Sequence, residues 1–243
     1  MASSVESGAK WVLSSLQRRF AAMLTGMTIV FGSTMTVVNA DVEIMPVKVL
    51  YFTFDDGPSL PYTPGILNVL RKHHIHGTFF VIGNRCEESP QLIRQLAVEG
   101  HAIGIHGYRH QSVATTNAEQ TLWEVEKTDE VLWKIARVHP QYYRPPYGRV
   151  SKDGEEAIRE SGHTLVFWSV DSRDWAARST SEIVKNVEDK AKPGSVVLFH
   201  DGIRESKMTA IALDILIPYF KAKGYSFETL SGRDAKYART VMR

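Results

Sequence analysis

Residues 48–58 read KVLYFTFDDGP, an apolar run that ends in two adjacent carboxylates, Asp55 and Asp56. The apolar part, residues 49–54, is typical of a buried strand, and the Gly-Pro pair marks the turn that follows it. Because successive side chains of a strand point to opposite faces, we expect the two carboxylates to point in different directions. One of them can then bind a metal ion while the other transfers a proton.

The rest of the chain repeats this order of a short apolar run followed by a longer amphipathic segment. The predicted strands are residues 49–54, 78–82, 102–105, 142–144, 164–168, 195–199 and 226–229. The predicted helices are residues 62–72, 90–99, 118–138, 153–161, 181–191 and 208–223. Such strict alternation of strands and helices favours one domain with a parallel sheet and helices outside it.

Ionisable side chains follow five of the seven predicted strands, at the point where each strand ends. They are Asp55, Asp56, His106, His110, Arg144, Asp171, Asp174 and His200. An open doubly wound sheet would spread these groups along a crevice, whereas a barrel gathers them at one mouth. We therefore predict an α/β fold, a distorted (β/α) barrel of about seven parallel strands.

The composition is that of an ordinary globular protein, with 243 residues, of which 43% are hydrophobic and 23% charged. These fractions exclude wholesale disorder and a multi-span membrane protein. The formal net charge of +2 predicts no nucleic-acid partner. The single cysteine, Cys86, excludes an intramolecular disulfide and a Cys-rich zinc site.

Residues 1–40 have the pattern of a secretory signal, with a basic start, an uncharged run at residues 20–38 and small side chains up to Ala40. The same run is long enough to span a bilayer as an uncleaved anchor. We expect residues 1–40 to be a signal peptide or an N-terminal anchor and residues 41–243 to be the catalytic domain. The protein is then exported to the periplasm, the cell envelope or the medium, and it meets a membrane only if the segment stays uncleaved.

His106 and His110 are four residues apart, so a helical turn or a tight loop would place both imidazoles on one side. Two histidines and one carboxylate with open positions suit zinc or another divalent transition metal used in catalysis. The competing interpretation is that Asp55 and Asp56 only cap a turn and that the histidines are solvated. Their coincidence with strand ends favours the metal site.

Three further segments carry groups that suit catalysis. Residues 144–148, RPPYG, join an arginine to a stiff backbone that could aim an N–H at an oxyanion. Residues 171–175, DSRDW, place carboxylates beside an aromatic side chain, and His200 ends an apolar run. A histidine held by a carboxylate is a candidate general acid, although an isolated His200 would more often be a structural core residue.

Taken in order, these segments resemble the five motifs of the polysaccharide deacetylases, the NodB-like carbohydrate esterase family 4. The motifs are TFDDGP at 53–58, HGYRH at 106–110, RPPYG at 144–148, DSRDW at 171–175 and LFH at 198–200. The resemblance runs from about residue 47 to residue 230. It implies a NodB-homology barrel, a divalent ion (Zn²⁺, or Co²⁺, Ni²⁺ or Mn²⁺), and removal of acetyl groups from N-acetylglucosamine in peptidoglycan or chitin-type oligosaccharides.

The resemblance also implies a role for each matching residue. The implied metal ligands are Asp56, His106 and His110. The implied catalytic residues are the general base Asp55, the general acid His200, Arg144 that orients Asp55, and Asp174 that holds the imidazole. The implied substrate-binding residues are Tyr147, whose backbone N–H faces the oxyanion, and Trp175 and Leu198, which line the acetyl-methyl pocket.

One position departs from the family pattern, because Gly107 follows His106 where the family usually has Ser or Thr. The lost hydroxyl would loosen the ligand loop and weaken metal affinity. Two alternatives to the deacetylase stay open: an acetylxylan esterase or other amidase on the same scaffold, and a non-catalytic glycan-binding module. The expected partner is an acetylated glycan, bound by a monomer.

Overall fold

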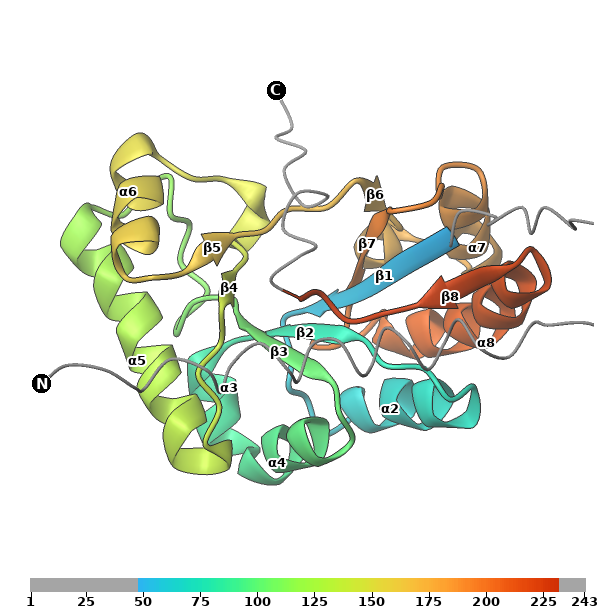
Figure 1. Ribbon diagram of the computed structural model, residues 1–243, viewed down its shortest axis with the longest axis horizontal. Coiled ribbons are helices and arrows are strands. Elements are labelled where there is room, and N and C mark those ends of the chain that lie inside the picture. Colours follow the sequence, from blue (N-terminus) through green and yellow to red (C-terminus); the bar gives the residue numbers. More distant parts are fainter. Residues whose placement is uncertain (1–47, 232–243) are drawn as a thin grey trace, which may run out of the picture. The chain divides into compact units, whose positions relative to one another are not determined.

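The structure is a computed structural model and describes residues 48–231 (Figure 1). Within this range one sheet contains the strands β1 (Lys48–Asp55), β2 (Thr78–Val81), β3 (Ala102–Ile105), β4 (Tyr142–Tyr143), β5 (Thr164–Leu165), β6 (Val170–Asp171), β7 (Val196–His200) and β8 (Tyr225–Phe227). Their order is β5-β4-β3-β2-β1-β7-β6, and β8 pairs with the start of β1. Each pairing of these strands is parallel. The predicted barrel-like sheet of about seven parallel strands is confirmed.

Helices connect the strands and lie around the outside of the curled sheet (Figure 1). They are α2 (Thr63–Lys72), α3 (Gly83–Glu88), α4 (Pro90–Val98), α5 (Ala118–Ala136), α6 (Lys152–Glu160), α7 (Thr180–Glu188) and α8 (Ser206–Ala222), with the short 3₁₀ helices η1 (Pro146–Gly148) and η2 (Asp174–Ala176). The parallel strands require such crossovers, because a tight hairpin cannot connect them.

One α-helix and one strand were not predicted from the sequence, α3 and β6. The helix α3 has six residues and β6 has two, so neither is long enough to show a periodic pattern. The predicted strand at residues 164–168 is also shorter in the structure, where β5 ends at Leu165. The chain then continues without regular structure to β6, which pairs with β7.

Alternation along β1 divides its side chains between two apolar layers. Phe52 and Phe54 belong to the main core between the sheet and the helices. Tyr51 belongs to a smaller cluster on the other face, with Phe80, Tyr142, Val166, Val196 and Leu230. By the same alternation Thr53 and Asp55 follow Tyr51 on this inner face. The carboxylate that ends β1 is thus directed into the interior of the curled sheet.

The register between β1 and β7 places further site residues on the same inner face. Asp55 lies opposite His200, and Thr53 lies opposite Leu198. Residues opposite each other in neighbouring strands direct their side chains to the same side of the sheet. Pairing of two strands therefore brings Asp55 and His200 together, although they are far apart in the sequence.

The predicted leader, residues 1–40, lies outside the described residues. In residues 48–231, no helix combines the length and the hydrophobicity that a membrane crossing requires. Cys86 is a free thiol and is buried in α3.

Behind the site, the backbone at Gly202 lies very close to the backbone of Asp56. A Cβ added to Gly202 would overlap with the carbonyl group of Asp56. We expect Gly202→Ala to lower the free energy of unfolding by about 1–3 kcal/mol, because the turn after β1 must move. Urea unfolding measures this change.

Gly65, inside α2, is the matched control for this substitution. Its added Cβ would meet only the Ala210 Cβ, at 3.9 Å. Gly65→Ala should raise the free energy of unfolding by about 0.5–1 kcal/mol, because alanine loses less backbone entropy in a helix. An unfolding midpoint of Gly202→Ala equal to that of the wild type would contradict the expected overlap.

Candidate active site

A pocket of about 360 Å³ lies where the strands end. Its lining residues belong to the ends of six strands (β1, β3, β4, β5, β6 and β7) or to the segments that follow them: Asp55, Asp56, His106, His110, Tyr147, Trp168, Asp171, Trp175, Leu198, His200 and Ile203. The sequence motifs thus meet at one mouth, as the barrel arrangement requires. Arg144 and Asp174 lie behind this lining and are completely buried.

Asp56, His106 and His110 form a group that fits a metal ion. Asp56 Oδ1 lies 3.4 Å from His106 Nε2 and 3.1 Å from His110 Nε2. Among the described residues, this is the one group of three or more His, Cys, Asp or Glu side chains with its ligand atoms within 4.8 Å of one another. Asp56 Oδ1 is buried and accepts no hydrogen bond of normal geometry within residues 48–231. A divalent cation would satisfy this oxygen and both imidazole nitrogens.

Asp56 leaves the strand in a left-handed backbone conformation, with φ of 73°. This conformation is uncommon for residues other than glycine and is concentrated at functional sites. Arg85 of α3 donates hydrogen bonds from Nη1 to the carbonyls of Asp56 and Gly202 and so fixes the turn. Burial alone would raise the pKa of Asp56, but His106 and His110 hold it far below its usual range. Asp56 is therefore ionised, as a candidate metal ligand should be.

His106 is oriented by a contact on its far side. Its Nδ1 lies 2.7 Å from the carbonyl oxygen of Arg144, which can only accept a proton. Nδ1 therefore carries a proton, and Nε2 is the nitrogen that faces Asp56 and could bind a metal ion. A carbonyl that holds the second ring nitrogen of a histidine is common at metal sites, because it fixes both the tautomer and the ring.

Asp55 has a different set of partners from those of Asp56. Arg144 Nη1 donates a 2.8 Å hydrogen bond to Asp55 Oδ1 and another of 2.8 Å to Thr53 Oγ1. The Arg144 guanidinium is also 4.1 Å from the centre of the Phe80 ring. Asp55 Oδ2 is 3.7 Å from His106 Nε2. One oxygen of Asp55 is thus held by arginine, and the other faces the candidate metal position.

His200 is held by Asp174, as the motif positions suggested. Its Nδ1 lies 2.7 Å from Asp174 Oδ1, and its backbone N–H donates to Asp174 Oδ2 at 2.8 Å. Thr209 and the backbone of Trp175 also donate hydrogen bonds to Asp174. Burial lowers the pKa of His200, but the hydrogen bond and charge of Asp174 outweigh burial and raise it to about 9. The imidazole therefore holds a proton at neutral pH, with Nε2 available to the pocket.

The walls of the pocket contain the three residues that the motifs assigned to substrate. Tyr147 and Trp175 are both more than half exposed, whereas Leu198 is buried at the base. Tyr147 lies in η1 with φ of 64°, and its ring centre is 4.8 Å from that of His110. Exposed aromatic rings at the rim and one aliphatic side chain below suit a sugar with a small apolar group.

Several residues of the site were not assigned a role from the sequence. Trp168, Asp171 and Ile203 line the pocket, and Arg85 fixes the Asp56 turn. The indole N–H of Trp168 is buried and has no hydrogen-bond partner in residues 48–231. Asp171 belongs to a recognised motif and was within reach of sequence reasoning. Arg85 was not, because it lies in a helix that the sequence did not predict.

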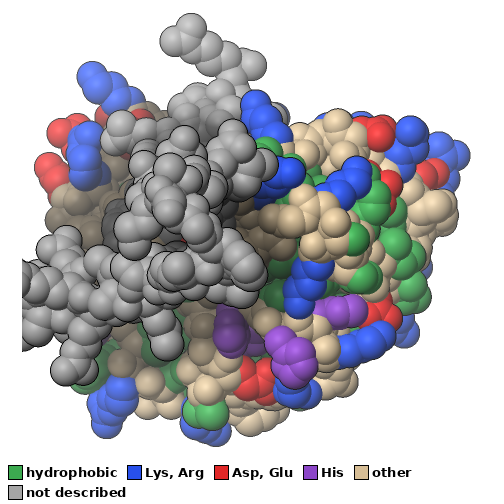
Figure 2. All heavy atoms as spheres, turned by 45° about the vertical axis from the view of Figure 1, so that its right-hand side comes forward, with side chains coloured by type: hydrophobic (Ala, Val, Ile, Leu, Met, Phe, Trp, Pro, Cys, Tyr) green, Lys and Arg blue, Asp and Glu red, His purple; other side chains and the backbone are tan. Residues whose placement is uncertain are grey.

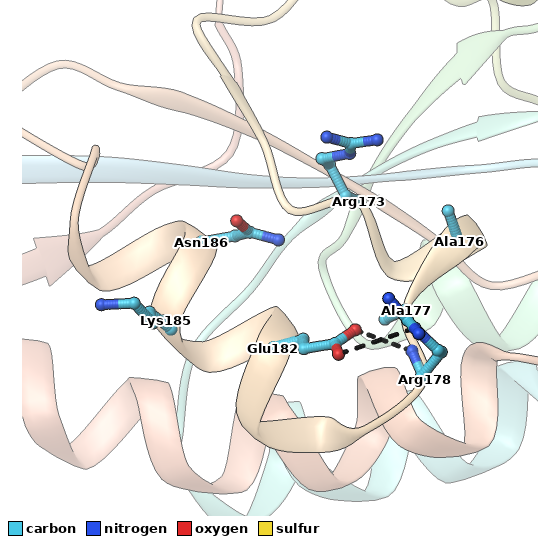
Figure 3. A pocket seen from close by; sticks show the side chains of 7 residues that line it. All are labelled: Arg173, Ala176, Ala177, Arg178, Glu182, Lys185 and Asn186. Carbon is cyan, nitrogen blue, oxygen red and sulfur yellow. Dashed lines mark hydrogen bonds and ion pairs between the residues drawn. The ribbon is translucent and has the colours of Figure 1, made fainter.

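Another pocket, of about 320 Å³, lies beside η2 and α7 (Figure 3). Arg178 and Glu182 interact across it, while Lys185 forms an ion pair with Asp189. Its charges are thus largely balanced among surface side chains. Arg173 and Trp175 stand on the same short segment, so η2 forms a wall between this pocket and the candidate active site.

Histidine side chains outside the site gather on one face beside acidic and basic residues (Figure 2). His74 and His76 are exposed, but His73 is half-buried, with Nε2 2.6 Å from Asp214 Oδ1. No ligand group of three forms among them in the described part of the chain.

The chain matches a sequence profile described as "Polysaccharide deacetylase" over residues 43–166. It is 39% identical over 179 residues to a peptidoglycan-N-acetylglucosamine deacetylase of Bacillus cereus, an alignment that covers 73% of this chain and 65% of the relative. It is 33% identical to a chitooligosaccharide deacetylase of Azorhizobium caulinodans, with 74% and 92% covered. The chain thus spans slightly less than two thirds of the length of the Bacillus cereus relative.

A solved structure supports the same relationship. A crystal structure of a peptidoglycan N-acetylglucosamine deacetylase, in complex with an N-oxidanyl-benzamide ligand, superposes with a TM-score of 0.72 and 38% identity. The superposition covers 74% of this chain and 85% of that one. The likeness therefore extends over most of the described residues.

The contact with Asp174 raises the pH at which the His200 imidazole loses its proton. In the metal-free protein, the His200 imidazole should titrate near pH 9, and Asp174→Asn should move its midpoint down toward 6.5. A raised pKa stabilises the folded protein below about pH 6.5, and this contribution disappears as pH rises through about 9. The pair contributes on the order of 3 kcal/mol at low pH. NMR titration of the imidazole C–H signals measures the midpoint.

Asp189→Asn serves as a control, because Asp189 is an exposed carboxylate in an ion pair with Lys185. This control should leave the His200 titration unchanged. A wild-type midpoint near 6.5 would show that Asp174 does not hold the proton on His200.

Proposed function

Since the chain belongs to the polysaccharide deacetylase family, we propose that it is a metal-dependent hydrolase that removes N-acetyl groups from a glycan and releases acetate. The observation that carries the proposal is one pocket that contains a His-His-Asp group together with Asp55 and His200. A carboxylate and a protonated imidazole beside a metal position are what hydrolysis of an amide requires.

Asp56, His106 and His110 would hold the ion, with Zn²⁺ as the first choice and Co²⁺, Ni²⁺ or Mn²⁺ as alternatives. Two imidazoles and one carboxylate leave coordination positions open, which is typical of catalytic rather than structural sites. The ion would act as a Lewis acid toward the acetyl carbonyl and make water more acidic. Coordination by His106 Nε2 is compatible with the tautomer of this residue, because its Nδ1 proton points away from the site.

The remaining residues would divide the proton transfers between them. Asp55 takes a proton from the attacking water, and Arg144 keeps its carboxylate directed toward the metal position. His200 donates a proton to the departing amine nitrogen, which is a poor leaving group without one. Asp174 keeps that proton available at neutral pH. The backbone N–H of Tyr147 donates to the oxygen that becomes negative.

The acetylated sugar would be N-acetylglucosamine, in peptidoglycan or in a chitin-type oligosaccharide. Relatives named for both substrates match this chain at similar identity. Leu198 would contact the acetyl methyl group, and Trp175 would pack against the sugar. Such glycans lie outside the cytoplasmic membrane, which supports the expectation that residues 1–40 direct export to the periplasm, the cell envelope or the medium.

Two substitutions test the assigned proton transfers. Asp55→Asn and His200→Ala should each lower kcat by about 10²–10⁴-fold and leave metal content unchanged, because neither residue is a ligand. Acetate release from acetylated chitin oligomers, measured beside the metal content of each variant, checks this. Turnover of Asp55→Asn near the wild-type rate would rule out Asp55 as the base.

A substrate panel tests the reaction class. Acetate release from peptidoglycan, chitin oligomers and acetylxylan is measured with the metal-loaded protein, before and after treatment with a chelator. We expect release from one or both amide substrates, loss of more than 90% of it with chelator as an order-of-magnitude expectation, and recovery on adding Zn²⁺. Release from acetylxylan alone would identify an esterase. No release and no bound metal would favour a glycan-binding module.

A further inference from the structure

Two of the three candidate metal ligands lie on one loop with little regular structure. The loop follows β3 and contains His106 and His110, and it is not part of any helix or strand. Its backbone adopts left-handed conformations at Gly107, with φ of 78°, and at His110, with φ of 59°. A loop in this conformation keeps its ligands in place only if the surrounding structure fixes it.

Glu124 of α5 contacts the loop from one side. Its Oε2 accepts hydrogen bonds from the backbone N–H groups of Tyr108 and Arg109, at 2.6 and 2.7 Å. Its Oε1 accepts a third from Arg109 Nε, at 3.0 Å. Hydrogen bonds to an ionised acceptor are about twice as strong as those between neutral groups. One carboxylate thus holds the backbone of the two residues in the middle of the ligand loop.

The helix α3 holds the same loop from another side. The N–H of Gly83 donates to the carbonyl of Gly107 at 3.0 Å, and the N–H of Asn84 donates to the carbonyl of Tyr108 at 3.1 Å. The carbonyl groups of the loop are therefore bound to α3 and its N–H groups to Glu124. This arrangement fixes two of the peptide planes between the histidines, 107–108 and 108–109, because each has its carbonyl bound to α3 and its N–H bound to Glu124.

Glu124 has no other evident reason to be buried. Only 3% of its surface is exposed, and it lies on the face of α5 that also contains Val125 and Thr128. A buried carboxylate is costly unless hydrogen bonds and an opposite charge compensate for the lost solvent. The loop provides all three of its hydrogen bonds. The carboxylate is not one of the grouped ligand side chains, so its contribution is to the loop.

The conformation at Gly107 depends on the same contact. A Cβ at this position would lie 3.2 Å from Glu124 Oε2, and φ of 78° is in any case unfavourable for other residues. The position where related sequences usually have Ser or Thr thus has a glycine that lets the carboxylate approach. The sequence led us to expect a looser loop, because Gly107 lacks a hydroxyl. In the structure, the side chain of Glu124 on α5 holds this loop instead.

We propose that Glu124 is a positioning residue that sets the metal affinity of the site by fixing the loop between His106 and His110. The inference rests on the proposed function, since it presupposes a metal ion at Asp56, His106 and His110. Without Glu124, the loop would have to be ordered when the metal binds, and the cost of ordering would appear as weaker binding.

The test measures metal binding directly with the full chain. Apo protein is titrated with Zn²⁺ against a chromophoric chelator, and the visible spectrum of the Co²⁺-loaded protein reports ligand geometry. We expect Glu124→Gln to weaken Zn²⁺ binding by about tenfold, because its neutral oxygen still accepts a hydrogen bond, and Glu124→Ala by about a hundredfold. The Co²⁺ spectrum should change in both variants.

Two control variants on α5 test whether weaker Zn²⁺ binding could come from the loss of any negative charge on this helix or from lower stability of the fold. Glu126→Gln removes an exposed carboxylate two residues further along and should bind Zn²⁺ as the wild type does. Val131→Ala opens a cavity at a core position and should lower the melting temperature without changing the Zn²⁺ affinity or the Co²⁺ spectrum. If Val131→Ala weakened Zn²⁺ binding as much as Glu124→Gln, loss of stability would explain both and the proposal would be wrong.

Gly107→Ser provides an independent variant on the other side of the contact. Its added side chain presses on Glu124, so Zn²⁺ binding should become weaker rather than stronger. Tighter binding by Gly107→Ser, or wild-type affinity in folded Glu124→Gln and Glu124→Ala, would overturn this proposal and leave the proposed function intact. A wild-type protein that bound no Zn²⁺ would overturn both.

Discussion

The site depends on one buried cation, the guanidinium of Arg144. Its side chain is completely buried and donates hydrogen bonds to Asp55, to Thr53 and to the carbonyl of Phe167. Its own carbonyl oxygen holds Nδ1 of His106. A buried charge is costly without such partners, so this residue requires β1, β4 and the segment after β5 to stay together. The proposed base, Asp55, and one candidate metal ligand, His106, are consequently fixed by the same residue.

His200 and Asp174 form a second pair in which the charges are reversed. Asp55 is a carboxylate held by a buried cation, whereas His200 is an imidazole held by a buried carboxylate. Because Asp55 lies opposite His200 in the pairing of β1 with β7, both functional groups open into the same pocket. Arg144 comes directly after β4 and Asp174 lies beyond β6, and these strands lie on opposite flanks of the β1–β7 pair. The proposed base and the proposed acid are thus held by groups from different parts of the sheet.

Sequence reasoning predicted the parts of this arrangement that depend on local patterns. Alternating apolar runs identified seven of the eight strands within the described residues, because buried parallel strands are short and hydrophobic. The candidate metal ligands were recognised from the types of residue that follow the predicted strands. The left-handed conformations of Asp56, His110 and Tyr147 were not predictable, since only tertiary contacts stabilise them in residues other than glycine. Arg85 was missed because α3 is too short to be recognised.

Glu124 shows why supporting residues are harder to recognise than ligands. In the sequence it is one of several charged residues on an amphipathic helix, where a carboxylate ordinarily faces water. Two of its three partners are backbone N–H groups, which any residue at 108 and 109 other than proline would provide. The third is the side chain of Arg109, which looks like an ordinary surface residue in the sequence. Residue types alone therefore do not reveal the contact, and the glycine at 107 acquires its meaning only from the helix packed against it.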